Sequence, residues 1–305
     1  MSAATYTAAG SVEEALAALA AGARPVAGGT DLVVGARNGK AALPESLVAI
    51  HRLSDLGGIR EQDGGLVLGA LATHADIVAS QPVCDRYTAL ADASAIVGSH
   101  ATRSTGTIGG NVMNASPAME TGGPLICFGA VARFRSAGGE REVPLAELFA
   151  GPGRTTASPE ELLTEVALPA PAAGTGSCYA RLEYRRQMEI AIVGATAVVT
   201  LDGGTVSDAR IAITALAPTI HRVAEAESAL NGTDGAADAV AAAANAAAAA
   251  SQPITDVRGS AEYRRAMAAV IARRAITTAL ARARGERFPI PASPALHGAV
   301  NGGAA

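Results

Sequence analysis

The sequence predicts an α+β protein, and three observations support this fold class. Helical and strand-like patterns alternate in the stretch from Ser11 to Ile50. A later stretch over 179–217 contains three strand-like segments and the turn sequence Asp202-Gly203-Gly204, which is typical of an antiparallel hairpin. An alanine-rich run and a long patterned segment follow, and both favour helix. This grouping indicates a chain in two parts, with a separate sheet-and-helix part at its C-terminal end.

The first part opens with a helix signature. Ser11 is a favourable N-cap residue, and Glu14 stands at the third position after it, before apolar residues at helical spacing. A short strand over 24–27, a helix that starts near Asp31 and a strand over 44–50 follow. This order predicts a small α/β subdomain over about residues 1–56.

A second subdomain is expected over residues 57–172. Gly65–Ala70 is an apolar run typical of a buried strand, and Thr73–Ile77 has the composition of a helix start. The remaining expected elements are a helix over 87–97 and strands over 131–135 and 165–169.

The segment Pro169–Gly176, rich in proline, alanine and glycine, is the predicted domain boundary. Residues 177–288 are then expected to form a C-terminal domain, and residues 289–305 a flexible tail. The elements expected in this domain are strands over 179–184, 192–201 and 209–217 and helices over 236–250 and 263–284.

The expected helix over 263–284 is strongly basic. Apolar residues recur along one face of it, which makes it amphipathic. Its arginines are therefore expected on a face that meets solvent or a partner protein; they are Arg264, Arg265, Arg273, Arg274, Arg282 and Arg284.

The composition argues against several functions. A formal net charge of −4 and a pI near 5.8 give no support for a nucleic-acid partner. The three cysteines and five histidines are dispersed without Cys-x-x-Cys spacing, so we assign no metal ligand. The first residues lack the basic and apolar blocks of a signal peptide, and no apolar run has membrane-spanning length. A cytoplasmic protein with no membrane span is expected.

Two short glycine-rich segments carry the strongest functional signal. They are Ala27-Gly28-Gly29-Thr30-Asp31 and Thr107-Ile108-Gly109-Gly110-Asn111. Glycine lacks a Cβ and permits positive φ, so backbone N–H groups in such loops can approach phosphate oxygens. The threonine and asparagine side chains add further donors. We interpret the pair as one site for a phosphate-bearing cofactor; the alternative is that each glycine pair only makes a tight turn.

Neither segment fits the commoner phosphate-binding patterns. The sequence contains no Gly-x-x-x-x-Gly-Lys-Ser/Thr, and no Gly-x-Gly-x-x-Gly stands between a strand and a helix. A P-loop and a Rossmann dinucleotide site are therefore not expected. Any redox chemistry would come from an organic cofactor, because no metal ligand set is present in the sequence.

Three segments resemble those of one flavoprotein family: Pro25–Leu32, Gly106–Asn111 with Ala115–Ala118 after it, and Asp256–Arg265. The family is the FAD-binding medium subunit of the molybdenum hydroxylases, of xanthine dehydrogenase and carbon monoxide dehydrogenase type. The resemblance covers roughly residues 3–288. It implies an FAD-binding domain of two subdomains (PCMH/vanillyl-alcohol-oxidase-like) plus a C-terminal three-stranded antiparallel sheet with a helical bundle.

The resemblance also implies which residues hold FAD. The two glycine segments match the loops that bind the diphosphate, and Val97 and Leu163 match positions that contact the cofactor. Arg181 stands where relatives have a basic residue near the flavin ring, where a cation could stabilise negative charge on reduced flavin. The alternative for Arg181 is an ordinary charge at a strand edge. The full expected set is Ala27, Gly28, Gly29, Thr30, Asp31, Val97, Thr107, Ile108, Gly109, Gly110, Asn111, Glu120, Leu163, Arg181 and Ile190.

The sequence departs from the family pattern at two of these positions. Glu120 stands where the family usually has an aspartate that contacts the cofactor, and its longer side chain requires some local rearrangement. Ile190 stands where some relatives have a tyrosine over the flavin ring and others have isoleucine. An aliphatic residue there is compatible with a nicotinamide that reaches the flavin.

The function implied is that of an oxidoreductase subunit with noncovalently bound FAD and no catalytic residue of its own. Electrons would arrive from 2Fe–2S clusters on a small subunit, after oxidation of substrate at a molybdenum–pterin centre on a large subunit. They would leave to NAD, a quinone or O₂. The implied assembly is a dimer of heterotrimers, a heterohexamer. Two alternatives stay open: a free-standing flavin reductase similar to the enolpyruvyl-UDP-N-acetylglucosamine reductases, and a non-catalytic assembly subunit that lacks the cofactor.

Overall fold

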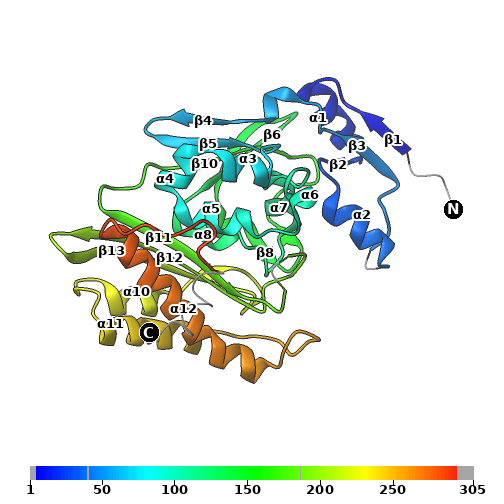
Figure 1. The fold of residues 1–305 in the computed structure, drawn as a ribbon. Coiled ribbons are helices and arrows are strands. Elements are labelled where there is room, and N and C mark those ends of the chain that lie inside the picture. The colour runs from blue at the N-terminus through cyan, green and yellow to red at the C-terminus, as the bar shows by residue number, and fades with distance from the viewer. Residues whose placement is uncertain (1–4, 40, 186, 294–305) are drawn as a thin grey trace.

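The N-terminal subdomain is a three-stranded parallel sheet with two helices (Figure 1). The computed structural model describes residues 5–39, 41–185 and 187–293. Ser11 caps the first helix by accepting a hydrogen bond from the Glu14 amide, as expected. The exposed first strand gives no apolar signal and was not predicted. The elements are β1 (Thr5–Ala8), α1 (Val12–Ala20), β2 (Arg24–Val26), α2 (Thr30–Arg37) and β3 (Ser46–Ala49), with sheet order β1-β3-β2.

The second subdomain is built on a five-stranded antiparallel sheet of order β4-β5-β10-β6-β7. Its core includes Leu68, Phe134 and Val166, all almost fully buried, together with residues of the helices that follow β5. Its strands are β4 (Ile59–Gln62), β5 (Gly65–Gly69), β6 (Val131–Ser136), β7 (Gly139–Pro144) and β10 (Leu162–Leu168), with the short pair β8 (Phe149–Gly151) and β9 (Arg154–Thr155) beside them. Its helices are η1 (Ser54–Leu56), α3 (His74–Ala79), α4 (Gln81–Arg86), α5 (Thr88–Ala95), α6 (His100–Arg103), α7 (Ile108–Asn114), α8 (Gly122–Cys127) and α9 (Leu145–Leu148).

The C-terminal domain has an antiparallel sheet of order β11-β12-β13-β14. The sheet has four strands where three were expected. The strand that was missed, β14, has only two residues, and such a short segment carries no periodic signal. The strands are β11 (Thr175–Leu182), β12 (Val193–Asp202), β13 (Thr205–Thr214) and β14 (His221–Arg222). The helices are α10 (Ala224–Leu230), α11 (Ala237–Ala249) and α12 (Ala261–Ala283).

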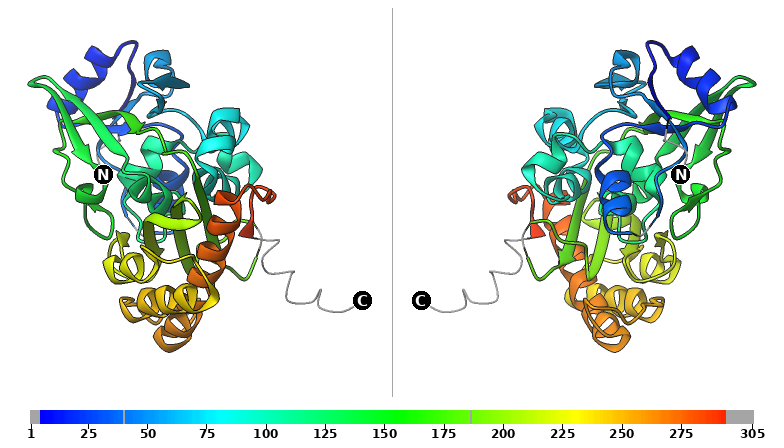
Figure 2. Two further views of the ribbon diagram at one scale, coloured as in Figure 1. Left: turned by 90° about the vertical axis from the view of Figure 1, so that its left-hand side faces the viewer. Right: turned by 90° about the vertical axis from the view of Figure 1, so that its right-hand side faces the viewer.

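This sheet lies between two layers of helices. Helix α12 packs on β11 and β12, whereas α5 and α8 of the second subdomain pack against the same sheet. Figures 1 and 2 show the yellow and orange helices α11 and α12 at one end of the molecule and the blue N-terminal subdomain at the other. The contact with α8 is close, because a Cβ on Gly123 would lie 2.4 Å from Thr196 Oγ1. The two domains therefore share one tightly packed interface.

Two arginines of α12 are buried, so the expectation that all of them face solvent or a partner was wrong. Arg282 forms an ion pair with the fully buried Asp92 of α5, with 2.6 Å between Nη1 and Oδ2. Arg264 forms an ion pair with Asp256 and donates to the Ile192 carbonyl. Helical periodicity in the sequence does not show such partners, because they come from other elements.

The segment after residue 288 is also packed in its first part. Ala292 and Ser293 are fully buried, and the Ala292 amide donates to Asp92 Oδ1 at 2.9 Å. The flexible tail expected from residue 289 is therefore wrong for residues 289–293, while 294–305 lie outside the described residues. No helix within the described ranges is both long and apolar enough to cross a membrane.

Candidate cofactor site

The two glycine segments lie against each other although they are distant in sequence. A Cβ on Gly28 would lie only 1.9 Å from the Thr105 carbonyl oxygen, just before the second segment. A Cβ on Gly106 would lie 3.4 Å from Thr30 Oγ1. Gly29 adopts a positive φ of 67° at the start of α2. Glycine is thus required at Gly28 by close approach and is favoured at Gly29 by backbone conformation.

The second segment is fixed to the end of strand β5. The Gly109 amide donates to the Ala70 carbonyl at 2.9 Å, and a Cβ on Gly109 would lie 2.7 Å from that residue. The buried Ile108 donates its amide to the Ala72 carbonyl. Thr107 Oγ1 accepts from the Gly110 amide at 3.1 Å, which closes the turn. The loop is therefore held by its backbone, with no room for larger residues at Gly109.

His74 lies beside this loop and is a residue that sequence reasoning did not select. Its amide donates to the Gly106 carbonyl at 3.2 Å, and the residue is 1% exposed. Its Nδ1 has no hydrogen-bond partner among the described residues. Burial, with a contribution from the Arg103 cation, lowers the pKa of His74 from 6.5 to about 4. The imidazole is therefore neutral near pH 7.

This shift predicts that His74 makes the protein less stable in acid. The pKa is lower in the folded state than in the unfolded state, so the unfolded chain binds the proton more tightly and stability falls as the pH drops from 6.5 towards 4. Because of His74, we expect the free energy of unfolding to be about 2 kcal/mol lower at about pH 5 than at about pH 7.5. Urea denaturation of wild type and His74→Asn at both pH values measures it. The exposed His100, substituted by Asn, is the control, and an equal pH dependence in wild type and His74→Asn would contradict the prediction.

Glu120 and Arg181, both predicted as cofactor contacts, form an ion pair with each other. Arg181 Nη1 lies 2.6 Å from Glu120 Oε1, and the side chain of Arg181 is fully buried. Glu183 lies on the other side of the guanidinium, at 3.3 Å from Nε. Burial raises the pKa of Glu120, and the charge of Arg181 opposes that shift. Arg181 is thus not an exposed strand-edge charge but the partner of a buried carboxylate from the other domain.

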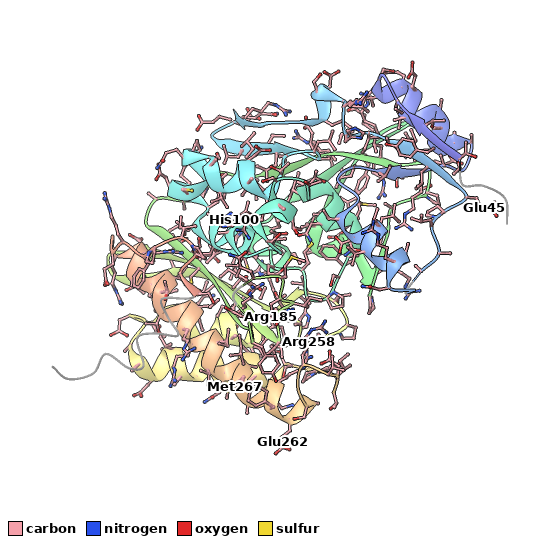
Figure 3. All side chains as sticks on the ribbon, turned by 45° about the vertical axis from the view of Figure 1, so that its right-hand side comes forward. Glu45, His100, Arg185, Arg258, Glu262 and Met267 are labelled. Carbon is pink, nitrogen blue, oxygen red and sulfur yellow. The ribbon has the colours of Figure 1, made fainter. Side chains whose placement is uncertain are left out.

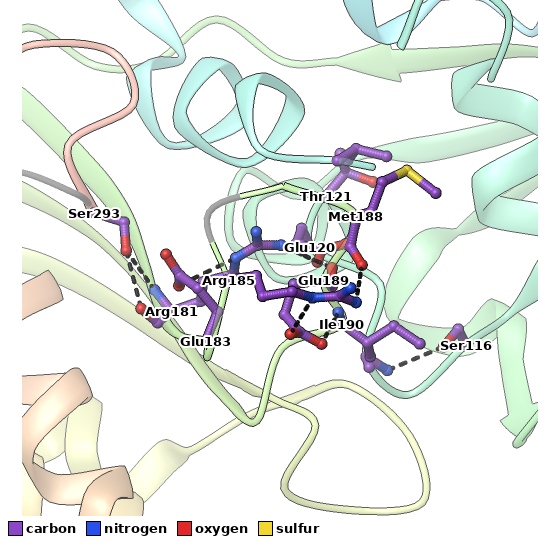
Figure 4. A network of polar contacts seen from close by, with 12 residues as sticks. Ser116, Glu120, Thr121, Arg181, Glu183, Arg185, Met188, Glu189, Ile190 and Ser293 are labelled. Carbon is purple, nitrogen blue, oxygen red and sulfur yellow. Dashed lines mark hydrogen bonds and ion pairs between the residues drawn. The ribbon is translucent and has the colours of Figure 1, made fainter. Parts of the chain in front are cut away.

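The backbone of Arg181 is held by the segment that follows α12 (Figure 4). Ser293 Oγ accepts from the Arg181 amide at 3.0 Å and donates to the Arg181 carbonyl at 3.0 Å. One serine hydroxyl therefore satisfies both peptide groups of an edge-strand residue. The guanidinium and the backbone of Arg181 are each held by partners from distant parts of the chain.

Ile190 lies in the loop between β11 and β12 and is 41% exposed. Met188 in the same loop has a positive φ of 52°, and its amide donates to the Gly98 carbonyl at 2.9 Å. Arg185 Nη2 donates to the Met188 carbonyl at 2.7 Å. Figure 3 labels Arg185 of this loop and His100 of α6, which belong to the two segments that meet here. The loop thus lies over the turn between α5 and α6 and leaves Ile190 accessible.

Val97 and Leu163 occupy different settings. Val97 lies in the turn after α5, and its carbonyl accepts from Arg103 Nη1 at 2.9 Å. Leu163 is 4% exposed and belongs to the core of the second subdomain. Its neighbour Thr164 accepts from the Ala70 amide, so Leu163 is adjacent in the sheet to the strand end that holds the second glycine segment. The side chain of Leu163 therefore packs in the core.

Asn111 and Asp31 complete the predicted set. Asn111 Oδ1 accepts from Thr121 Oγ1 at 2.6 Å, and Thr121 directly follows Glu120. Asp31 lies in the first turn of α2 and is exposed. The structure therefore brings together the two glycine segments, and it joins the second to Glu120 and so to Arg181. Within the part of the chain that the structure describes, no group of three or more His, Cys, Asp or Glu side chains could hold a metal ion.

Comparison with known proteins shows which family the chain belongs to. Residues 2–171 match the family described as the FAD-binding domain in molybdopterin dehydrogenase, and residues 178–279 match the CO dehydrogenase flavoprotein C-terminal domain. The carbon monoxide dehydrogenase medium chain of Hydrogenophaga pseudoflava is 36% identical over 282 residues, 91% of this chain and 97% of that protein. The alpha subunit of the 6-hydroxypseudooxynicotine dehydrogenase complex of Paenarthrobacter nicotinovorans is 36% identical over 92% of this chain and 95% of its own.

Solved structures show the same fold. The structure of carbon monoxide dehydrogenase from Hydrogenophaga pseudoflava superposes with a TM-score of 0.88 at 37% identity, covering 92% of this chain and 98% of that one. Quinoline 2-oxidoreductase from Pseudomonas putida 86 gives a TM-score of 0.86 at 29% identity, covering 93% and 98%. The fold and the paired glycine loops thus define a flavoprotein of the molybdopterin dehydrogenases. The chain belongs to the family of FAD-binding medium subunits of molybdenum hydroxylases, of carbon monoxide and xanthine dehydrogenase type.

Proposed function

We propose that this chain transfers electrons through FAD from the 2Fe–2S clusters of a small subunit to an external acceptor. The observation that carries the proposal is the contact between Gly28 and Thr105, which places the glycine segment at the start of α2 directly beside the second glycine segment. The first amides of a helix have no intrahelical acceptor, so those of α2 are suited to phosphate oxygens where glycine lets a ligand approach. The residues present therefore fit the phosphate part of FAD.

The proposed roles follow from where each residue lies. Residues 27–31 and 107–111 would hold the diphosphate, while Val97, Leu163, Glu120, Arg181 and Ile190 would flank the rest of the cofactor. When bound, FAD supplies the redox chemistry, accepting single electrons and releasing them in pairs. The protein binds and orients it, and the ion pair of Arg181 with Glu120, together with the hydrogen bonds between Ser293 and the Arg181 backbone, fixes this side of the site.

The proposed partners are a large subunit with the molybdenum–pterin cofactor and a small subunit with 2Fe–2S clusters, assembled as a dimer of heterotrimers. The proposed acceptor is NAD, a quinone or O₂, and the aliphatic, accessible Ile190 is compatible with an approaching nicotinamide. Relatives named for carbon monoxide and for 6-hydroxypseudooxynicotine are each 36% identical to this chain, so similarity here does not select a substrate.

Purification from the native host tests this function. We expect a yellow complex that releases FAD on denaturation and contains a large and a 2Fe–2S-bearing small subunit. Anaerobic addition of the substrate of the complex is expected to bleach the flavin, and NAD⁺, quinone and O₂ are then compared as reoxidants. A yellow protein without partners that reduces a substrate by itself would favour the free-standing reductase. A colourless protein that stays empty with added FAD would contradict the proposal.

A further inference from the structure

Arg103, the last residue of α6, is a buried cation that no resemblance or prediction singled out. The residue is 9% exposed, and its Nη1 donates to the Val97 carbonyl at 2.9 Å. Among the described residues no carboxylate lies within 4.0 Å of its guanidinium, and that carbonyl is its hydrogen-bond partner. A buried charge without an opposite charge is costly. Arg103 therefore needs an anion that the protein itself does not supply.

Arg103 and Arg181 differ in the charged groups that surround their guanidinium groups. Arg181 has two carboxylates at its guanidinium, Glu120 at 2.6 Å and Glu183 at 3.3 Å. The groups that act electrostatically on Arg103 include Arg181, a second cation, and the buried His74 is a neutral neighbour. Of these two arginines, Arg103 is the one whose charge is not already balanced by carboxylates in the described structure.

The position of Arg103 identifies the anion. Arg103 stands just before Thr105, whose carbonyl meets Gly28, and Gly106, which meets Thr30, so its backbone lies at the junction of the two glycine segments. Its charge acts on His74, whose amide donates to the Gly106 carbonyl of the second segment. The isoalloxazine ring of oxidised FAD is neutral, and the formal negative charges of the cofactor are on its diphosphate. We propose that Arg103 is a further FAD-binding residue whose positive charge is balanced by the diphosphate. This inference rests on the proposed function and deepens it.

The proposal makes opposite predictions for the apoprotein and the FAD complex. Without FAD, the charge of Arg103 is a cost, so its removal leaves the apoprotein as stable as wild type or more stable. With FAD, the same removal takes away an attractive interaction and weakens binding. If Arg103 only stabilised the turn at Val97, its removal would lower the stability of both the apoprotein and the FAD complex.

The test uses the full chain after removal of FAD, with three variants. Arg103→Met removes the charge at similar length, Arg103→Lys keeps it, and Arg273→Met is the control because Arg273 is an exposed arginine of α12. FAD affinity is measured by quenching of flavin fluorescence, and apoprotein stability by calorimetry. We expect Arg103→Met to weaken FAD binding about 10- to 100-fold with no loss of apoprotein melting temperature. Arg103→Lys retains most of the affinity, and Arg273→Met matches wild type.

ADP serves as a second probe because it carries the diphosphate without the flavin. We expect Arg103→Met to weaken ADP binding as well. The inference is overturned if Arg103→Met binds FAD like wild type, if ADP affinity is unchanged, or if the apoprotein melts lower in proportion to the loss of FAD affinity. A wild-type protein that binds ADP but not FAD would instead contradict the proposed function. A wild-type protein that binds neither would contradict both the proposed function and the inference about Arg103.

Discussion

Replacement of Gly28 by alanine is expected to weaken FAD binding by about 100-fold or more, about 2.7 kcal/mol. The added Cβ would lie 1.9 Å from the Thr105 carbonyl oxygen, and the contacted atom belongs to the backbone rather than to a flexible side chain. The two loops must separate to accommodate it, so a diphosphate can no longer contact both loops in the proposed way. Titration of the FAD-free variant with FAD, followed by calorimetry, measures the loss.

Gly35→Ala is the matched control for this substitution. Gly35 lies within α2, which starts directly after the first glycine segment, and nothing lies within 4 Å of a Cβ at this position. Alanine in a helix interior is favoured over glycine by about 0.5–1 kcal/mol. We expect Gly35→Ala to raise stability by this amount and to leave FAD affinity unchanged. Equal FAD affinities in the two variants would show that the approach of Gly28 to Thr105 does not matter for binding.

Loss of the Asp92 carboxylate is expected to have the largest effect on stability, about 3–5 kcal/mol. Asp92 is fully buried and accepts hydrogen bonds from both Nη atoms of Arg282, from the Ala292 amide and from the Tyr179 amide. Its removal leaves the buried Arg282 cation with carbonyl partners but without the carboxylate that balances its charge, and leaves two amides without acceptors. Urea denaturation of Asp92→Ala measures the change in unfolding free energy.

Asp208→Ala serves as the comparison because Asp208 pairs with Arg210 at the surface. These side chains are 49% and 36% exposed, and exposed pairs contribute only about 0–1 kcal/mol. A double-mutant cycle with Arg282→Met then isolates the coupling across the domain interface. If Asp92→Ala cost no more than Asp208→Ala, the buried pair would not be what joins α5 to α12.

The elements with a strong local signal were predictable from the sequence. The cap at Ser11, the hairpin at Asp202–Gly204 and the glycine segments depend on residue types whose preferences act over a few positions. The glycine segments could be recognised from their residue types alone, whereas the approach of Gly28 to Thr105 that requires glycine there is a tertiary contact. These features therefore could be recognised before any tertiary contact was known.

The rest depends on partners that are distant in the chain. Two ion pairs, Glu120 with Arg181 and Asp92 with Arg282, join residues from different domains. No local sequence pattern indicates such pairs. An arginine in a helix looks the same in sequence whether it faces water or a buried carboxylate. The charge of Arg103 just before the second glycine segment was a usable signal, but an arginine next to a loop is common on protein surfaces that bind no anion. Ser293 offered no signal at all.

The hydrogen bonds from Ser293 to Arg181 have a consequence for the order of events during synthesis. Residues 289–293 leave the ribosome after both domains, yet they supply Asp92 with an amide and Arg181 with partners for both of its peptide groups. Because domains fold largely in the order in which they are made, a nascent chain can complete its sheets before Ser293 reaches the backbone of Arg181. Completion of the proposed cofactor site is thereby coupled to translation of a few residues beyond the last helix.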